Sequence, residues 1–121
     1  MHIQLAELPV FDQDRAKAFY TEKLGCSPVA DVPMSDDGWR WIELGFPGAQ
    51  TTLHFMRRAD DNLSPEPVLA LIDDDVEGAV NALKTKGVEI LSEPQAAPWD
   101  PERIGAEFRD SEGNRIVISS P

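Results

Sequence analysis

Histidine, the side chain that most readily binds a transition metal or moves a proton near neutral pH, occurs only twice in this chain of 121 residues. Its two histidines are His2, near the N-terminus, and His54, in the middle of the run TTLHFM at residues 51–56. A metal site needs three or four oxygen, nitrogen or sulfur donors that converge at about 2.0 to 2.3 Å. His54 is therefore either one ligand of such a site or a polar strand residue that lines a pocket. In the second case its imidazole contacts a neighbouring residue, water or a ligand. Three glutamates on expected strands could add carboxylate donors if their side chains point inward: Glu7, Glu43 and Glu107.

Aromatic residues offer a second kind of chemistry, because indole rings stack on planar or cationic guests. Trp39 and Trp41 alternate along one expected strand, so we expect them to share a face, which either contacts a ligand or covers a sheet or a dimer interface. Trp99 follows the proline-rich segment EPQAAPW. The single cysteine, Cys26, excludes an intrachain disulfide and a thiolate-rich zinc site, and its place at a helix exit favours plain packing.

The charge of the chain narrows the classes of partner. It has 22 acidic and 11 basic residues and a formal charge of −11, which repels phosphate backbones and anionic lipid surfaces. We therefore expect no nucleic-acid partner and no membrane contact. No apolar stretch reaches the roughly 20 residues of a membrane span, and the start MHIQLAELPV lacks the features of a signal peptide, so a cytoplasmic protein is expected.

Two segments have the apolar spacing of amphipathic helices. In residues 12–25 the sequence predicts a cap at Asp12 or Asp14 and a left-handed stop at Gly25, and residues 74–87 repeat the design with Gly87 at the end. The apolar stripes are Ala16, Phe19, Tyr20 and Leu24 in the first helix and Val76, Ala79, Val80 and Leu83 in the second.

Strand-like runs flank both helices in the same order. One run precedes each helix and three follow it, so the order of strand, helix and three strands is written twice. Gly25 and Gly87 are 62 positions apart, which indicates an internal duplication. We expect a first module at 1–58, a second at 66–121 and a connector at 59–65. The expected strands are residues 3–10, 27–33, 39–46, 50–57, 67–73, 88–94, 104–109 and 115–120.

The segments LPVFDQDRAKAFYTEKLG and EFRDSEGNRIVI resemble the vicinal oxygen chelate superfamily, which includes glyoxalase I, extradiol dioxygenases and bleomycin-resistance proteins. The resemblance covers nearly the whole chain. It implies an α+β fold in which two βαβββ modules form a curved eight-stranded mixed sheet around a cleft, with the helices outside, and it implies a homodimer. It does not imply one reaction, because this scaffold hosts several.

The resemblance also implies where a metal would bind. Enzymes of the family take ligands from the first and fourth strands of each module, and these positions here are Leu5, His54, Val68 and Val117. Leu5 and Val68 are 63 positions apart, as are His54 and Val117, so the placement agrees with the duplication. Only His54 can donate. Glu7 shares a face with Leu5 and is the best substitute donor. A metal site at Glu7 and His54, shifted from the family's standard position, is therefore an alternative.

Other residues are expected to face the cleft. Arg115 and Ser119 share the strand face of Val117, and a buried Arg115 needs an anionic partner, either Glu7, Glu107 or a carboxylate of the substrate. The resemblance to antibiotic-binding members of the family implies that aromatic residues in the groove stack on planar rings. The expected ligand-binding residues are Glu7, Trp39, Trp41, His54, Trp99 and Arg115.

The sequence therefore predicts a homodimeric protein without the standard metal site and without a cofactor, which binds a small planar or cationic organic molecule in an aromatic-lined cleft. The alternative is a metal-dependent lyase, isomerase or dioxygenase with a non-standard divalent-metal site around Glu7 and His54. A third hypothesis is a module whose cleft is filled by its own side chains.

Overall fold

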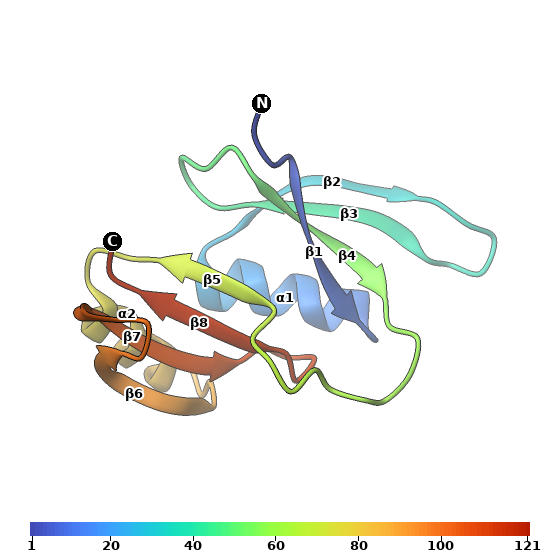
Figure 1. Ribbon diagram of the computed structural model, residues 1–121. Helices are drawn as coiled ribbons and strands as arrows, with labels where there is room; N and C mark the ends of the chain where they lie inside the picture. Colours follow the sequence, from blue (N-terminus) through green and yellow to red (C-terminus); the bar gives the residue numbers. More distant parts are fainter. The chain divides into compact units, whose positions relative to one another are not determined.

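The computed structural model describes residues 1–121, which divide into two compact units, Met1–Asp61 and Asn62–Pro121. Each unit is a strand, a helix and three strands, as Figure 1 shows, so the predicted α+β fold of two βαβββ modules is confirmed. The first unit contains β1 (Leu5–Val10), α1 (Gln13–Leu24), β2 (Ser27–Pro33), β3 (Arg40–Gly45) and β4 (Thr52–Arg57). The second contains β5 (Leu69–Ile72), α2 (Val76–Thr85), β6 (Ile90–Ala97), β7 (Asp100–Arg109) and β8 (Arg115–Ser119).

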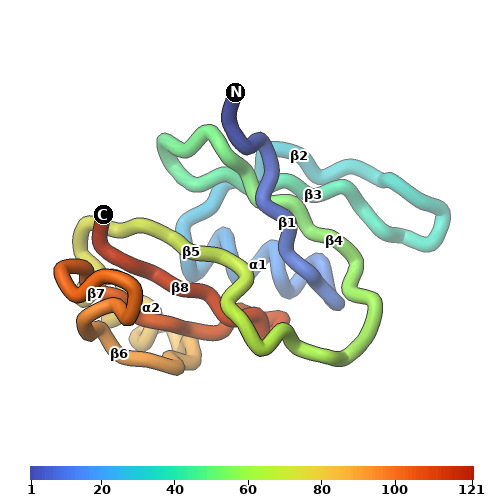
Figure 2. The backbone as a smooth tube through the Cα atoms, viewed as in Figure 1, coloured from blue at the N-terminus to red at the C-terminus, as the bar shows by residue number.

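Both units have the same sheet topology. The strands of the first sheet are ordered β1-β4-β3-β2, and those of the second β5-β8-β7-β6. In each sheet the first and fourth strands of the unit are parallel and the other neighbours are antiparallel. The tube in Figure 2 follows these parallel neighbours, β1 beside β4 and β5 beside β8. The repeated topology is the structural counterpart of the duplication in the sequence.

One face of each sheet forms a core with its helix. In the first unit Tyr20 of α1 is fully buried and its ring centroid lies 6.2 Å from that of Phe55 on β4. In the second unit Val80 and Leu83 of α2 and Phe108 of β7 are buried. The alternation of side chains along a strand places the next residues on the opposite, open face. The other buried apolar strand residues are Leu8, Val10, Ile42, Leu44 and Leu53 in the first sheet and Ala97, Ala106, Ile116 and Ile118 in the second.

The ends of the helices follow the sequence signals. The Asp12 side chain accepts a hydrogen bond from the backbone N–H of Arg15, which makes Asp12 rather than Asp14 the cap of α1. Gly25 has φ 76° and ends α1 in the left-handed conformation. Asp75 caps α2 through the N–H of Gly78. Sequence and structure therefore agree on how each helix begins and on how α1 ends.

The hairpin of β6 and β7 is longer than the sequence indicates. The expected strands were 88–94 and 104–109, whereas β6 continues to Ala97 and β7 begins at Asp100, so the segment EPQAAPW is strand and turn. Pro94 is tolerated because β6 is the outer strand of its sheet and its pairing with β7 is irregular between Ser92 and Gln95. Trp99 therefore lies in a hairpin turn.

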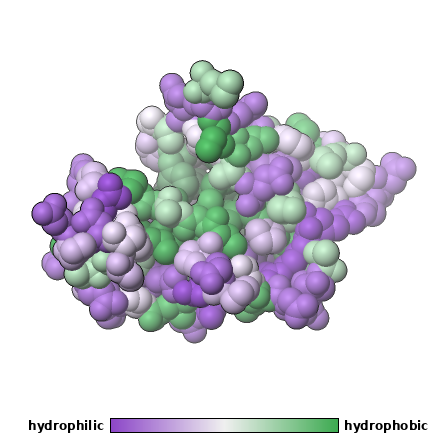
Figure 3. Space-filling model, in the orientation of Figure 1, coloured by the Kyte–Doolittle hydropathy of each residue, from purple (hydrophilic) through white to green (hydrophobic).

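Hydrophilic residues, drawn in purple, form much of the surface visible in Figure 3, as the acidic composition leads one to expect. Neither helix is long and apolar enough to cross a membrane.

Candidate functional site

Three of the candidate residues form one row across the open face of the first sheet. Glu7 on β1 is paired with His54 on β4, and His54 is paired with Glu43 on β3. All three point away from the core, because their neighbours along each strand, such as Leu8 and Phe55, are buried against the helix side. The sheet register thus collects two carboxylates and one imidazole that are far apart in the sequence.

His54 lies at the centre of this row and is 8% exposed. The centroid of its ring is 3.9 Å from that of Trp41, with 32° between the ring planes. Its Nδ1 lies 3.6 Å from Oε1 of Glu7, which is beyond hydrogen-bond distance, and no protein group bonds to either ring nitrogen. A buried imidazole with two unused nitrogens is unusual, because each unsatisfied polar group costs about 1 to 3 kcal/mol.

Glu43 fixes the position of Trp41. The indole Nε1 of Trp41 donates to Oε1 of Glu43 at 3.0 Å, and the hydroxyl of Thr52 donates to Oε2 at 2.9 Å. Both carboxylate oxygens are thus engaged inside the protein. Glu43 holds the indole beside His54 and is poorly placed to serve as a donor to anything else.

Trp39 belongs to a different cluster. Its side chain precedes β3, and the guanidinium carbon of Arg57 lies 4.7 Å from its ring centroid. Nη1 of Arg57 is 2.7 Å from Oδ2 of Asp37. The hydrogen bond from Arg57 holds the pKa of Asp37 well below its usual range, with further contributions from Ser35 and Trp39. Trp39 is therefore engaged with Arg57, whereas Trp41 stacks on His54.

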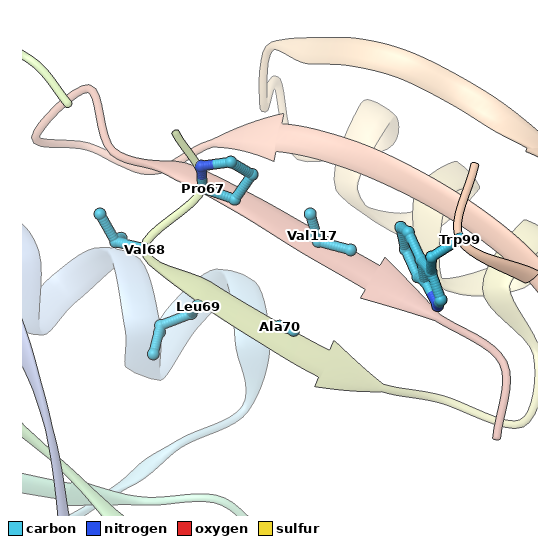
Figure 4. A pocket seen from close by; sticks show the side chains of 6 residues that line it. All are labelled: Pro67, Val68, Leu69, Ala70, Trp99 and Val117. Atoms are coloured by element: carbon cyan, nitrogen blue, oxygen red, sulfur yellow. The ribbon is translucent and has the colours of Figure 1, made fainter. Parts of the chain in front are cut away.

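The second unit contains an apolar pocket with a volume of about 330 Å³. Figure 4 shows the Trp99 side chain beside Val117 of β8, with Pro67 and the start of β5 on the other side. No titratable side chain lines it, and the indole N–H is the only polar side-chain group among the lining residues. The lining residues are Pro67, Val68, Leu69, Ala70, Trp99 and Val117. Such a pocket can bind the apolar body of a ligand and stack on a ring, but it supplies no acid, base or nucleophile.

Arg115 is two residues from Val117, which lines this pocket, but its side chain is hydrogen-bonded to other residues of the second unit. Its Nη2 is 2.9 Å from Oε1 of Glu107, and its Nε is 3.1 Å from Oε2 of the same carboxylate. Its Nη1 donates to the carbonyl of Pro65. Of the three partners considered for Arg115, the structure shows Glu107. Ser119 is 2% exposed on β8, opposite Gly105.

The donor set does not fit the family's metal site. Leu5, Val68 and Val117 have hydrocarbon side chains without a donor atom, and Val68 and Val117 line the apolar pocket. In the sheet ladders the residue opposite His54 is Glu7, while Leu5 is opposite Thr52. No group of three or more His, Cys, Asp or Glu side chains is placed to hold a metal ion. The nearest approach to a donor set is the pair of Glu7 and His54.

Several residues at these places could not be recognised from their residue type alone. Pro67 and Ala70 line the pocket, and Thr52 supports Glu43, although small and common residue types carry no chemical signal. The 63-residue spacing offered one indirect route, because Ala70 follows Glu7 by 63 positions and is paired with Val117 as Glu7 is with His54.

Comparisons with known proteins agree with this architecture. Residues 2–118 match the model of the Glyoxalase/Bleomycin resistance protein/Dioxygenase superfamily. Among curated proteins, YetH of Bacillus subtilis (strain 168) is 35% identical over 111 residues, which cover 90% of this chain and 89% of YetH. YurT of the same organism is 33% identical over 129 residues, with 98% of each chain covered.

Solved structures show the same fold. TnmS3 of Streptomyces sp. CB03234, described as an antibiotic binding protein, is 32% identical and superposes with a TM-score of 0.82, covering 100% of this chain and 96% of its own. A glyoxalase/bleomycin resistance protein from the same organism is 30% identical with a TM-score of 0.75, covering 97% of this chain and 98% of its own.

Proposed function

Because the chain belongs to the Glyoxalase/Bleomycin resistance protein/Dioxygenase superfamily, and because its second unit has an apolar pocket lined by Val68 and Val117, to which the resemblance assigns two of the family's metal ligands, we propose that it binds a small planar organic molecule without a metal ion. Trp99 stacks on the guest, and Val68, Ala70 and Val117 contact its edges. The protein thereby sequesters or carries the guest, and no bond of the guest is made or broken.

The observation that carries this proposal is that Val68 and Val117, the two positions of the second unit to which the resemblance assigns metal ligands, line the apolar pocket. Coordination needs lone pairs, which valine lacks, so the same two positions that would hold a metal here provide apolar surface. Burial of apolar guest surface is favourable by about 25 cal/mol per Å². Trp99 is 56% exposed and offers an indole face at the pocket without first breaking a buried contact. The similarity to TnmS3, an antibiotic binding protein, supports binding as the function.

The alternative is an enzyme that holds a divalent metal at Glu7 and His54. The distance of 3.6 Å between Oε1 of Glu7 and Nδ1 of His54 favours it, because two donor side chains are adjacent. A third ligand is missing, since both oxygens of Glu43 already accept hydrogen bonds. Two ligands are fewer than the three that catalytic metal sites ordinarily take from the protein. Binding without metal is therefore the function that the geometry supports best.

A thermal-shift and calorimetric screen of planar and cationic aromatic compounds tests the proposal. Native protein should bind at least one class saturably, and the Trp99→Ala variant should lose about tenfold or more in affinity for it. Leu91→Ala is the matched control, because Leu91 is an exposed apolar residue of the same unit that does not line the pocket. Failure of all compounds to bind native protein would instead favour a module that fills its cleft with its own side chains.

The proposal includes a homodimer. The outer strand β2 exposes Val29 and Val32, and an apolar outer strand is a surface on which a second chain can pair. Sedimentation velocity should give a particle of two chains, and a particle of one chain at micromolar concentration would contradict this part of the proposal.

A further inference from the structure

Gly105 of β7 lies against the indole of Trp99. It is on the open face of the second sheet, because its neighbour Ala106 is buried on the helix side. A Cβ atom at Gly105 would lie 3.6 Å from Cη2 of Trp99 and 3.5 Å from Cβ of Ala97. These are ordinary van der Waals distances, so the space above Gly105 holds one carbon atom. The outer edge of the indole occupies the space that a longer side chain at this position would need.

The backbone does not require a glycine at position 105. The glycines with a positive φ are five others, and Gly105 is paired with Ser119 in the regular ladder of β7 and β8. A β-branched residue is favoured over glycine at such a strand position. The missing side chain therefore serves the packing of Trp99 and not the conformation of the chain.

The same indole forms one wall of the apolar pocket. Because Gly105 is paired with Ser119, Val117 is its diagonal neighbour on the same face of the sheet. Diagonal neighbours of this kind are about 7 to 8 Å apart. Trp99 and Val117 both line the pocket, and Figure 4 shows their side chains next to each other. The contact with Gly105 therefore determines where the indole stands beside Val117.

Trp99 has a small share of its surface in packing contacts. It lies in the turn between β6 and β7 and is 56% exposed. A fully buried residue touches about 6 to 12 others, whereas a half-exposed one is held by fewer. Each remaining contact thus contributes more to the position of the ring, and the contact with Gly105 is one of them.

We propose that Gly105 is a positioning residue of the binding site, whose missing side chain allows the Trp99 indole to stand against β7 and so sets the width that the pocket offers to a planar guest. The volume of about 330 Å³ is near the lower end of the range of about 300 to 1,000 Å³ for ligand pockets, which suits a compact fused-ring guest. This role of Gly105 rests on the proposed function, because the width of the pocket matters only if a guest binds there.

The first readout locates the indole without any guest. Full-length protein labelled with 5-fluorotryptophan has one ¹⁹F resonance for each of its three tryptophans, and Trp99→Ala identifies that of Trp99. Gly105→Val should move this resonance, because its methyl groups enter the space of the ring. Ala96→Leu adds the same three carbon atoms and is the matched control, because Ala96 is exposed and is paired with Ile104, on the opposite face from Gly105. It should leave the Trp99 resonance at its native position.

A double-mutant cycle provides the second readout. Gly105→Val should lower the affinity for a planar compound that native protein binds by about tenfold, measured by calorimetry. In the Trp99→Ala background the same change should lower it by less than about twofold, because the indole through which Gly105 acts is absent. A role of Gly105 in the strand alone would give equal losses in both backgrounds.

Either an unmoved Trp99 resonance in Gly105→Val or equal losses of affinity in the two backgrounds would overturn the proposal. If Gly105→Val does not fold, its combination with Trp99→Ala should fold, because removal of the indole frees the space, and a combination that also fails to fold would contradict the proposal. A native protein that binds no planar compound would contradict the proposed function instead. The fluorine resonance would then still show whether Gly105 positions Trp99.

Discussion

Glu7 and His54 stand opposite each other in the parallel ladder of the first sheet, and the equivalent pair in the second sheet is Ala70 and Val117. The duplication has therefore kept the backbone register and changed the chemistry. One copy presents a carboxylate and an imidazole, and the other presents methyl groups beside Trp99. This asymmetry leads to different predictions for the two units.

Filling the apolar pocket should block binding and leave the fold intact. Ala70→Phe places a ring in the pocket from the outer strand β5, so affinity for a bound planar compound should fall at least tenfold, measured by calorimetry. Ile72→Phe is the control, because Ile72 is exposed two residues further along β5 and does not line the pocket. If both variants bind like the native protein, the guest is elsewhere.

Metal content should be far below one ion per chain in protein purified without chelator, because Val68 and Val117 supply no donors. Elemental analysis measures this, and EDTA should leave the thermal midpoint unchanged. One zinc, nickel, manganese or iron ion per chain, together with a midpoint lowered by EDTA, would instead establish the alternative site at Glu7 and His54.

Asp31 should stabilise the first unit in a pH-dependent way. Arg40 and Lys17 each bond to its carboxylate at 2.8 Å and hold its pKa below the usual value, with Arg40 the larger cause. A lowered folded-state pKa gives stability that is present above the unfolded value of about 3.9 and is lost as pH falls through the folded value. Asp31→Asn should cost about 1 kcal/mol at pH 7, reduced by solvent screening of the partly exposed partners.

Urea titrations of the native and Asp31→Asn proteins at pH 7 and at pH 2.5 measure this contribution. The difference in unfolding free energy should shrink at the lower pH. Asp36→Asn changes an exposed carboxylate of the same unit and serves as the control. A cost for Asp31→Asn that is the same at both pH values would show that charge is not its origin.

Gln13 joins helix α1 to the beginning of β3. Its side-chain amide donates to the carbonyl of Arg40 at 2.6 Å and accepts from the N–H of Arg40 at 2.9 Å, and the residue is buried. Gln13→Leu leaves two backbone groups of β3 without these partners, and should lower the unfolding free energy by about 1 to 3 kcal/mol. Gln50→Leu, at an exposed loop position, should change it by less than about 0.5 kcal/mol. Similar losses in the two variants would contradict this role.

Cys26 should be chemically quiet in the folded protein. Burial raises the pKa of its thiol to about 11, so the thiolate that reacts with iodoacetamide is scarce at neutral pH. Alkylation followed by mass spectrometry should be slow in buffer and fast in denaturing urea. Rapid modification of native protein at pH 7 would show that the thiol is accessible and ionised.

The sequence was sufficient for the order of the elements because the local signals were strong. Asp12 and Asp75 mark the helix starts through side-chain oxygens that accept hydrogen bonds from backbone N–H groups, and Gly25 marks the end of α1 through its left-handed conformation. The apolar stripes select the buried faces. The extension of β6 was missed because two prolines normally indicate a loop. Only the knowledge that β6 is an outer strand makes Pro94 acceptable, and that is a property of the whole sheet.

The candidate site depended more heavily on the register of the sheets. Period-2 alternation placed Glu7 on the open face but could not decide whether His54 is paired with Leu5 or Glu7, because a shift of two residues preserves the face. Similarly, three carboxylates were possible partners of Arg115, and Glu107 is selected by the pairing of β7 with β8. Which side chains of a face touch is set by tertiary neighbours, as the separate contacts of Trp39 and Trp41 illustrate.

A crystal structure of the native protein with a planar compound from the binding screen tests the central claim most directly. The account predicts that the ring of the guest lies against the Trp99 indole and contacts Val117 and Ala70, with no metal ion between guest and protein. A guest coordinated to a metal ion held by Glu7 and His54, with the Trp99 pocket empty, would contradict it.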